Sequence, residues 1–252
     1  MRRQQLSRLW PPALILSVWQ LTAWRGWLNA LFFPSPGHIL ATAWDLVRSG
    51  EIERHLEATF ARFLAAFLVG SATGIPLGLL LGSSAFWRRS LQSLLTGLHA
   101  TPKLALLPAF LVLFGLNEGA RLLPAALSCF VVTAVYSMDA AGAVSRSYLD
   151  LARSYGAGRR TLFFRVYLPA CLPNLFTGMR LGLGNALVMV VATELLTSTT
   201  GLGSLIWITS QTLALDRMYV GIAVCTLLGI AKNGVFRRVE RRLAPWALEH
   251  EA

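Results

Sequence analysis

The chain has 252 residues, of which 55% are hydrophobic and 14% are charged, and its formal net charge is +11. This composition is too apolar for a soluble domain of this length, and several apolar runs reach the roughly 20 residues that a helix needs to span a bilayer. The basic residues lie between the apolar runs, so a membrane topology explains the charge better than nucleic-acid binding does. We therefore expect an all-α, polytopic membrane protein with about six transmembrane helices.

Residues 1–33 predict an N-terminal transmembrane helix. Three arginines precede an apolar, tryptophan-rich run that extends from about residue 10 to 33. A signal peptide is the alternative, but the run is long and no small-x-small cleavage site follows it closely. An uncleaved first span with its N-terminus inside is therefore the preferred interpretation.

Residues 34–57 predict an amphipathic linker on the outer surface. Ser35 followed by Pro36 is typical of a helix start, and apolar residues then recur at helical spacing. Two interpretations remain open for this segment. It is either a simple connecting helix or a contact surface for an external protein.

Residues 58–236 form the expected transmembrane core, in which the second span covers about residues 58–82. Small residues allow helix backbones to approach closely in lipid. Four glycines recur every four residues on this span and form a stripe on one face: Gly70, Gly74, Gly78 and Gly82. Such a stripe packs helices either within one subunit, which we prefer, or at an interface between subunits.

The later spans are expected at about residues 94–116, 122–140, 173–196 and 218–236, followed by a C-terminal tail at 237–252. Three polar residues on these spans are candidates for a polar pathway: Lys103, Asn185 and Glu194. A charge at bilayer mid-depth costs about 2.5–3.5 kcal/mol on insertion scales. The alternatives are a lysine that snorkels to the surface, and interface hydrogen bonds for the other two residues. We expect water to reach Glu194, because it lies near the outer end of its span.

The segment 141–172 is a long polar loop between two apolar runs. Its central part, residues 150–169, carries Arg153, Arg159, Arg160 and Arg165, and Gly156 interrupts it where a turn needs a residue that accepts positive φ. A short hairpin link between helices does not require so much polar chain. We therefore expect a docking element at the membrane surface.

The distribution of arginines predicts the topology. Three arginines precede the first span, Arg88 and Arg89 follow the second, five lie between the fourth and fifth, and four follow the sixth. Acidic residues are concentrated in the intervening segments. Under the positive-inside rule both termini and residues 150–169 face the cytoplasm.

The loop resembles that of inner-membrane permease subunits of binding-protein-dependent ABC importers. That loop has the form Glu-Ala-Ala, three residues, Gly, nine residues, then Ile-x-Leu-Pro. The matching positions here are Asp150, Leu151, Ala152, Gly156, Val166, Leu168 and Pro169. The spacing is met in full, with Asp in place of Glu and Leu in place of the first Ala. The resemblance extends from about residue 34 to 242 and is closest to the branch for aliphatic sulfonates, taurine and nitrate.

The resemblance implies a type I permease bundle that is not itself an enzyme. It also implies an ABC ATPase dimer that holds ATP, a second permease copy forming a homodimer, an extracytoplasmic solute-binding protein and membrane lipid as partners. The residues that it assigns to ATPase coupling are Asp150, Leu151, Ala152, Arg153, Gly156, Arg159, Arg160 and Pro169. The sequence itself contains no Walker A motif, no catalytic or metal-ligand motif and three isolated cysteines, so we expect no cofactor on this chain.

Other functions remain open at this point. The same machinery also suits bicarbonate or a thiamine precursor. An ion-coupled secondary transporter is an alternative of another class, for which Glu194 is the best coupling carboxylate. A membrane scaffold is a further alternative, and it would tolerate changes at Lys103, Asn185 and Gly156.

Overall fold

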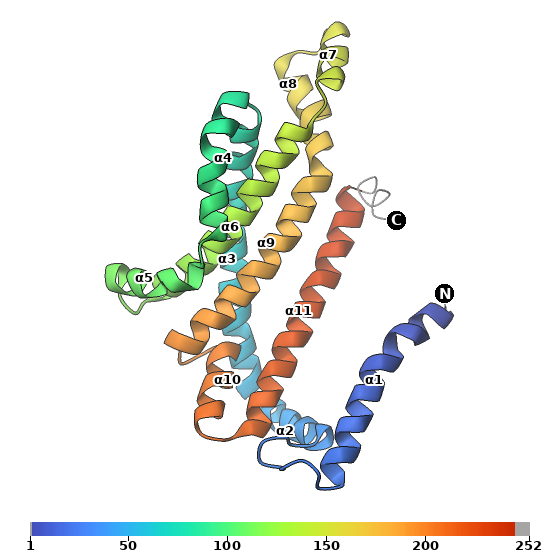
Figure 1. Ribbon diagram of the computed structural model, residues 1–252, viewed down its shortest axis with the longest axis vertical. Helices are drawn as coiled ribbons and strands as arrows, with labels where there is room; N and C mark the ends of the chain where they lie inside the picture. Colours follow the sequence, from blue (N-terminus) through green and yellow to red (C-terminus); the bar gives the residue numbers. More distant parts are fainter. Residues whose placement is uncertain (1, 245–252) are drawn as a thin grey trace. The chain divides into compact units, whose positions relative to one another are not determined.

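Every regular element in residues 2–244, the part of the chain that the computed structural model describes, is helical (Figure 1). The helices are α1 (Arg2–Trp24), α2 (Pro36–Arg48), α3 (Glu51–Gly82), α4 (Ala85–Ala100), η1 (Lys103–Leu106), α5 (Leu107–Phe114), α6 (Glu118–Ala143), α7 (Arg146–Ser154), α8 (Arg159–Leu162), η2 (Phe163–Tyr167), α9 (Leu168–Thr197), α10 (Leu202–Gln211) and α11 (Leu215–Leu243). The expected all-α class is confirmed.

Four helical segments in the described part are long and apolar enough to cross a membrane: Glu51–Gly82, Glu118–Ala143, Arg159–Thr197 and Leu215–Leu243. The pair formed by Ala85–Ala100 and Lys103–Phe114 raises the number to five if it counts as one span. The predicted first span falls on α1, which contains Pro11 and Pro12, ends at Trp24 rather than near residue 33, and is not among these candidate segments.

A straight third span over residues 94–116 is wrong, because the chain bends by 85° between α4 and the helices that follow. The bend falls at Thr101 and Pro102. Thr101 is extended, with φ −65° and ψ 132°, as the residue before a proline tends to be. Pro102 has no N–H with which to continue the hydrogen bonds of α4.

The described residues divide into two compact units. Unit 1 contains the residues up to Thr59 together with Glu194–Leu227, and unit 2 contains Phe60–Thr193 together with the residues from Leu228 onward. In unit 1, Ser35 accepts a hydrogen bond from the His38 N–H at the start of α2, which confirms the predicted helix start. A buried apolar cluster joins α2, α3 and α11: Leu46, Ile52 and Val220.

Unit 2 is built around the contact between α3 and α6, which the glycine stripe makes possible. A Cβ atom added at any of Gly70, Gly74, Gly78 or Gly82 would lie less than 3.0 Å from α6 atoms. For Gly78 those atoms include the Ala134 carbonyl oxygen. The stripe therefore faces a helix of the same chain and lets the two backbones touch. The larger apolar cluster of this unit includes Phe63, Ala125, Cys129, Phe176 and Phe236.

Candidate functional site

The predicted turn in the polar loop is present at Gly156. Helix α7 ends at Ser154, and Gly156 has φ +78°. The Gly156 N–H donates to the Arg153 carbonyl (2.9 Å) and the Ala157 N–H donates to the Ala152 carbonyl (3.1 Å). This pair of bonds is the Schellman motif, in which a left-handed glycine satisfies the last carbonyls of a helix. The loop thus contains the predicted turn, and the short helix α7 precedes it.

The part of the loop after the turn differs from the prediction. Residues 159–172 were expected to be loop, but α8 and the π-helical turn η2 (Phe163–Tyr167) continue directly into α9. Pro169 is the second residue of α9. It has no N–H with which to continue the helical hydrogen bonds, and the π-helical turn η2 lies directly before α9 in the chain. The Tyr167 hydroxyl donates to the Ala141 carbonyl (3.2 Å) and fastens this segment to the end of α6.

The residues that the resemblance assigns to coupling are mostly exposed. Asp150, Leu151, Arg153, Gly156, Arg159 and Arg160 are exposed, and Ala152 and Pro169 are half-buried. Large apolar side chains are exposed beside them, with Leu151 at 57% and Tyr155 at 84%. Arg153 pairs with Asp150 across one helical turn at 3.0 Å. A surface that combines arginine with exposed aromatic and aliphatic side chains is typical of a protein interface.

Of the three candidate pathway residues, Lys103 and Asn185 are accessible. Lys103 is half-buried at the start of η1, and its Nζ donates to the His99 carbonyl at the end of α4. Asn185 is exposed on α9. The lysine therefore stabilises the bend between α4 and η1 through a local hydrogen bond. A straight span would not contain this bend, so the prediction did not include that role.

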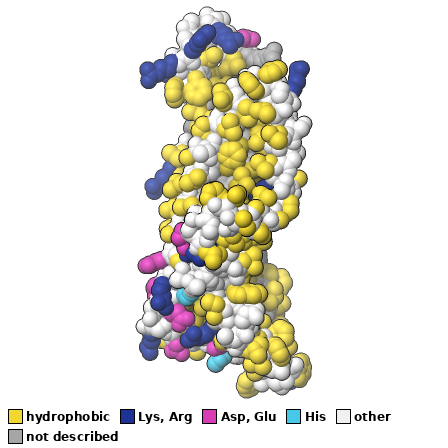
Figure 2. Space-filling model, turned by 90° about the vertical axis from the view of Figure 1, so that its left-hand side faces the viewer, with side chains coloured by type: hydrophobic (Ala, Val, Ile, Leu, Met, Phe, Trp, Pro, Cys, Tyr) yellow, Lys and Arg dark blue, Asp and Glu magenta, His cyan; other side chains and the backbone are white. Residues whose placement is uncertain are grey.

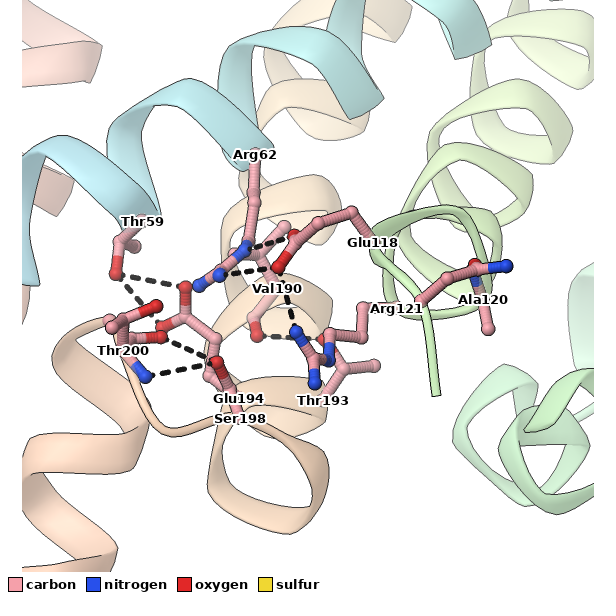
Figure 3. A network of polar contacts seen from close by, with 12 residues as sticks. Thr59, Arg62, Glu118, Ala120, Arg121, Val190, Thr193, Glu194, Ser198 and Thr200 are labelled. Atoms are coloured by element: carbon pink, nitrogen blue, oxygen red, sulfur yellow. Dashed lines mark hydrogen bonds and ion pairs between the residues drawn. The ribbon is translucent and has the colours of Figure 1, made fainter. Parts of the chain in front are cut away.

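Glu194 is placed differently from the expectation of solvation by water, because it is completely buried within unit 1. Figure 3 shows its carboxylate beside Thr59 of α3. The Thr59 hydroxyl donates to Glu194 Oε2 (2.8 Å), and the Gly203 N–H at the start of α10 donates to the same oxygen (3.0 Å). The Leu202 N–H donates to Thr59 Oγ1 (2.7 Å). The carboxylate and the hydroxyl thus satisfy N–H groups at the start of α10.

The same network fixes the turn that precedes α10. Gly201 has φ +121°, and a Cβ atom at this position would overlap the Glu194 carboxylate. The imidazole of His55, which is also buried, lies against this turn, with Nδ1 3.0 Å from the Gly201 nitrogen. Glycine is therefore required at 201 for both its conformation and its size.

Sequence reasoning missed a second charged cluster, which lies within unit 2. Arg62 donates to both Glu118 oxygens, with distances of 2.8 and 2.9 Å, and Arg121 donates to Glu118 Oε1 at 2.7 Å (Figure 3). The two arginine side chains are 12% and 17% exposed, and that of Glu118 is 61% exposed. The sequence did contain one sign of this cluster. Arg62 and Arg121 lie near the expected outer ends of their spans, whereas the positive-inside rule places most arginines on the inner side.

Within residues 2–244, no group of three or more histidine, cysteine, aspartate or glutamate side chains is placed to hold a metal ion. Buried polar groups such as Thr59 and Glu194 form hydrogen-bonded networks that position helices, whereas the candidate residues Arg153, Arg159, Lys103 and Asn185 are accessible.

The chain matches the family described as binding-protein-dependent transport system inner membrane component over residues 74–245. It is 31% identical over 240 residues to the putative aliphatic sulfonates transport permease protein SsuC of Bacillus subtilis, covering 95% of this chain and 87% of the relative. It is 30% identical over 239 residues to the taurine transport system permease protein TauC of Escherichia coli, covering 93% and 87%.

Solved structures support the same fold. A chain of the MetNI methionine ABC transporter in an inward-facing conformation superposes with a TM-score of 0.65 at 19% identity, covering 80% of this chain and 97% of that chain. The chain therefore belongs to the inner-membrane component family of binding-protein-dependent transport systems. It is a permease subunit of an ABC importer, a translocation component and not an enzyme.

Proposed function

We propose that this permease subunit carries a small organic sulfonate of the aliphatic sulfonate or taurine type across the bacterial inner membrane. The names of its relatives support this substrate class. One relative is a formylaminopyrimidine transport permease of Halalkalibacterium halodurans, so a thiamine precursor is the second candidate. A binding protein captures the solute outside the membrane in such systems, so the permease needs few residues of its own for recognition.

The observation that carries the proposed coupling mechanism is the exposed α7 helix that ends in the Gly156 turn. Leu151, Arg153 and Tyr155 present an apolar and cationic surface. We infer that α7 enters a cleft on a separate ATPase and that Arg159 and Arg160 pair with acidic groups there. Closure of the ATPase dimer would then move α7, and the helices joined to it would open the pathway alternately to each side.

The proposed assembly contains two copies of this chain, an ATPase dimer that holds ATP and an extracytoplasmic solute-binding protein. Both termini and the α7–α8 loop lie on the cytoplasmic side, as the arginine distribution indicates. The proposed regions are the first helix within 1–33, the outer linker 34–57, the core 58–236 and the tail 237–252.

For the pathway we propose Lys103 and Asn185, which are accessible and polar. Glu194 contributes in another way, because its carboxylate is buried and holds the start of α10. Its role is therefore to position α10 and the turn before it. An ion-coupled transporter would require a carboxylate that exchanges protons with water, and the burial of Glu194 argues against that alternative.

The coupling proposal is tested with Gly156→Arg and the matched control Gly158→Arg. Both glycines are exposed and have open space around them, but Gly158 has a negative φ of −68°. We expect Gly156→Arg to abolish solute uptake and co-purification of the cognate ABC ATPase while membrane insertion is retained. Gly158→Arg should retain most of both, and normal uptake by the Gly156 variant would refute the proposal. Screening solutes against the co-purifying binding protein tests the substrate class separately.

A further inference from the structure

A cavity of about 680 Å³ lies in unit 2 between the end of α3, the helices α7 and α8, and the segment where η2 leads into α9. This volume is within the range of about 300–1,000 Å³ that is typical of ligand sites. Most of its wall is apolar, with Ile75 and Leu79 from α3 and Phe163 and Leu168 from the other side. Two arginines, Arg153 and Arg159, also line it.

A second cavity of about 380 Å³ adjoins the first and is more polar. The two cavities share three lining residues, Ser83, Leu149 and Tyr167. Arg88 and Arg89 line the second cavity. Together the two adjoining cavities are apolar in one part and are lined by four arginines.

Positive charge dominates this space. Among the described residues that line the two cavities, none is acidic. Asp150 pairs with Arg153, but both side chains are more than 60% exposed, and an exposed pair of this kind contributes little. Asp150 therefore offsets at most one of the four arginines. Figure 2 shows the dark blue basic side chains around α7 and α8, above an area of yellow hydrophobic side chains.

The cavity lies at the ends of two candidate membrane spans. Its α3 wall comes from the last turns of the span that ends at Gly82, and its other wall comes from the first turns of the span that begins at Arg159. The wall residues Leu80 and Phe163 are 65% and 40% exposed, so the apolar part is accessible from the side. In the orientation proposed above, these ends belong to the cytoplasmic leaflet.

We propose that this amphiphilic cavity binds one anionic phospholipid of the cytoplasmic leaflet. An acyl chain lies against the apolar wall formed by Ile75, Leu79 and Phe163, and the phosphate lies toward Arg153 and Arg159. A small soluble anion would leave the apolar wall in contact with water, and an apolar protein segment would bury the guanidinium groups without partners. An anionic lipid satisfies both parts, and basic residues at a membrane surface attract such lipids.

The proposal has a consequence for the movement of α7. The lipid would lie between α7 and the end of α3, so its binding would favour one position of the loop. This consequence rests on the proposed coupling role of the loop. Binding of lipid to the isolated subunit does not rest on that role. Because Arg153 and Arg159 belong to both proposals, lipid binding and ATPase co-purification are measured separately.

Native mass spectrometry of the delipidated full-length permease in an uncharged detergent tests the binding. The probes are dioleoyl phosphatidylglycerol, zwitterionic dioleoyl phosphatidylcholine and glycerol phosphate, which has the anionic group without the chains. We expect one phosphatidylglycerol to bind at least tenfold more tightly than phosphatidylcholine, and glycerol phosphate to bind far more weakly. Arg153→Gln and Arg159→Gln should each weaken phosphatidylglycerol binding about fivefold, equivalent to about 1 kcal/mol per arginine.

The matched control is Arg165→Gln. Arg165 is exposed on η2, between two residues that line the cavity, but it does not itself line it. We expect this variant to bind phosphatidylglycerol as the unmodified chain does. Equal losses at Arg165 and Arg159 would overturn the proposal, since they would show diffuse attraction by surface charge. Equal binding of the two lipids, or binding of glycerol phosphate as tight as that of phosphatidylglycerol, would overturn it as well.

A second measurement needs no substitution. A photoreactive phosphatidylglycerol, incorporated into vesicles that contain the assembled transporter, should crosslink to residues 75–83 and 159–168. Crosslinks elsewhere would overturn the site. Crosslinks that form with the isolated subunit but not with the assembled transporter would overturn it too, and would assign the cavity to a protein partner.

Discussion

Glycine serves opposite purposes in two regions of unit 2. Along α3, Gly70, Gly74, Gly78 and Gly82 are needed because the α6 backbone leaves no room for a side chain. At the end of α7, Gly156 has open space around it and is needed only for its positive φ. The first region is a buried helix contact that determines whether the unit folds. The second is an exposed turn that determines the direction of a surface helix.

The same contrast applies to two carboxylates. Glu194 is completely buried and accepts hydrogen bonds from Thr59 and Gly203. Asp150 is exposed and has Arg153 as its partner on the same helix. Substitutions in the buried regions should therefore affect the stability of the whole protein, whereas substitutions in the exposed loop should affect local order and association with partners.

The largest effect is expected for Gly78→Val. Its Cβ would overlap the Ala134 carbonyl oxygen and Ser137, so α3 and α6 would have to separate. Overpacking typically costs about 1–3 kcal/mol, and backbone cannot move aside as a side chain can. We expect the detergent-extracted protein to aggregate or to unfold at a clearly lower temperature in a thermal-shift assay. Gly97→Val on α4, where an added Cβ meets nothing within 4 Å, is the control. Equal stability of the two variants would contradict the packing interpretation.

The next largest effect is expected for Glu194→Ala. This change leaves the Thr59 hydroxyl and the Gly203 N–H without their acceptor inside the protein. Leaving buried polar groups unsatisfied costs about 1–3 kcal/mol. We expect a lower unfolding temperature and faster hydrogen exchange at the start of α10. Asp150→Ala should leave both quantities unchanged, and a Glu194 variant as stable as the unmodified chain would show that the network adds no stability.

A smaller and local effect is expected for Gly156→Ala. An L-residue in the left-handed region costs roughly 1–2 kcal/mol, so the end of α7 should fray while the unfolding temperature stays the same. Hydrogen exchange of residues 146–158 measures this. Gly158→Ala, with its negative φ, should show no increase. If the two variants exchange equally, the turn does not depend on the positive φ of Gly156.

The smallest effect is expected for Asp150→Asn, which removes the ion pair with Arg153. Exposed ion pairs contribute about 0–1 kcal/mol, so thermal stability should be unchanged within error. If Asp150 contacts the ATPase as proposed, co-purification of that partner will nevertheless fall. A loss of stability without a loss of association would show that the pair is structural.

Much of the fold could be predicted because its causes are local. Apolar runs of membrane length identified the helical class, and Ser35 with Pro36 identified the start of α2. Gly156 within the basic loop identified the turn. The bend at Pro102 was missed because hydropathy does not report direction, although the proline was visible in the sequence.

The polar networks could not be predicted, because their members are far apart in the chain. Arg62 and Glu118 are separated by 56 residues, and Thr59 and Glu194 by 135. Each residue alone fits several roles, and Glu194 at the end of an apolar run was as compatible with solvation as with burial. Only the residues that fold beside Glu194 decide between these two outcomes.

The sequence by itself determined that the chain is a helical membrane protein with an exposed basic loop turning at Gly156, because hydrophobicity, charge and backbone freedom are properties of individual residues and short spacings. Only the tertiary structure decided that the α3 glycines face α6, that Glu194 holds α10, and that Arg153 and Arg159 border an apolar cavity. Those outcomes depend on which distant surfaces come into contact, and contact is a property of the folded chain.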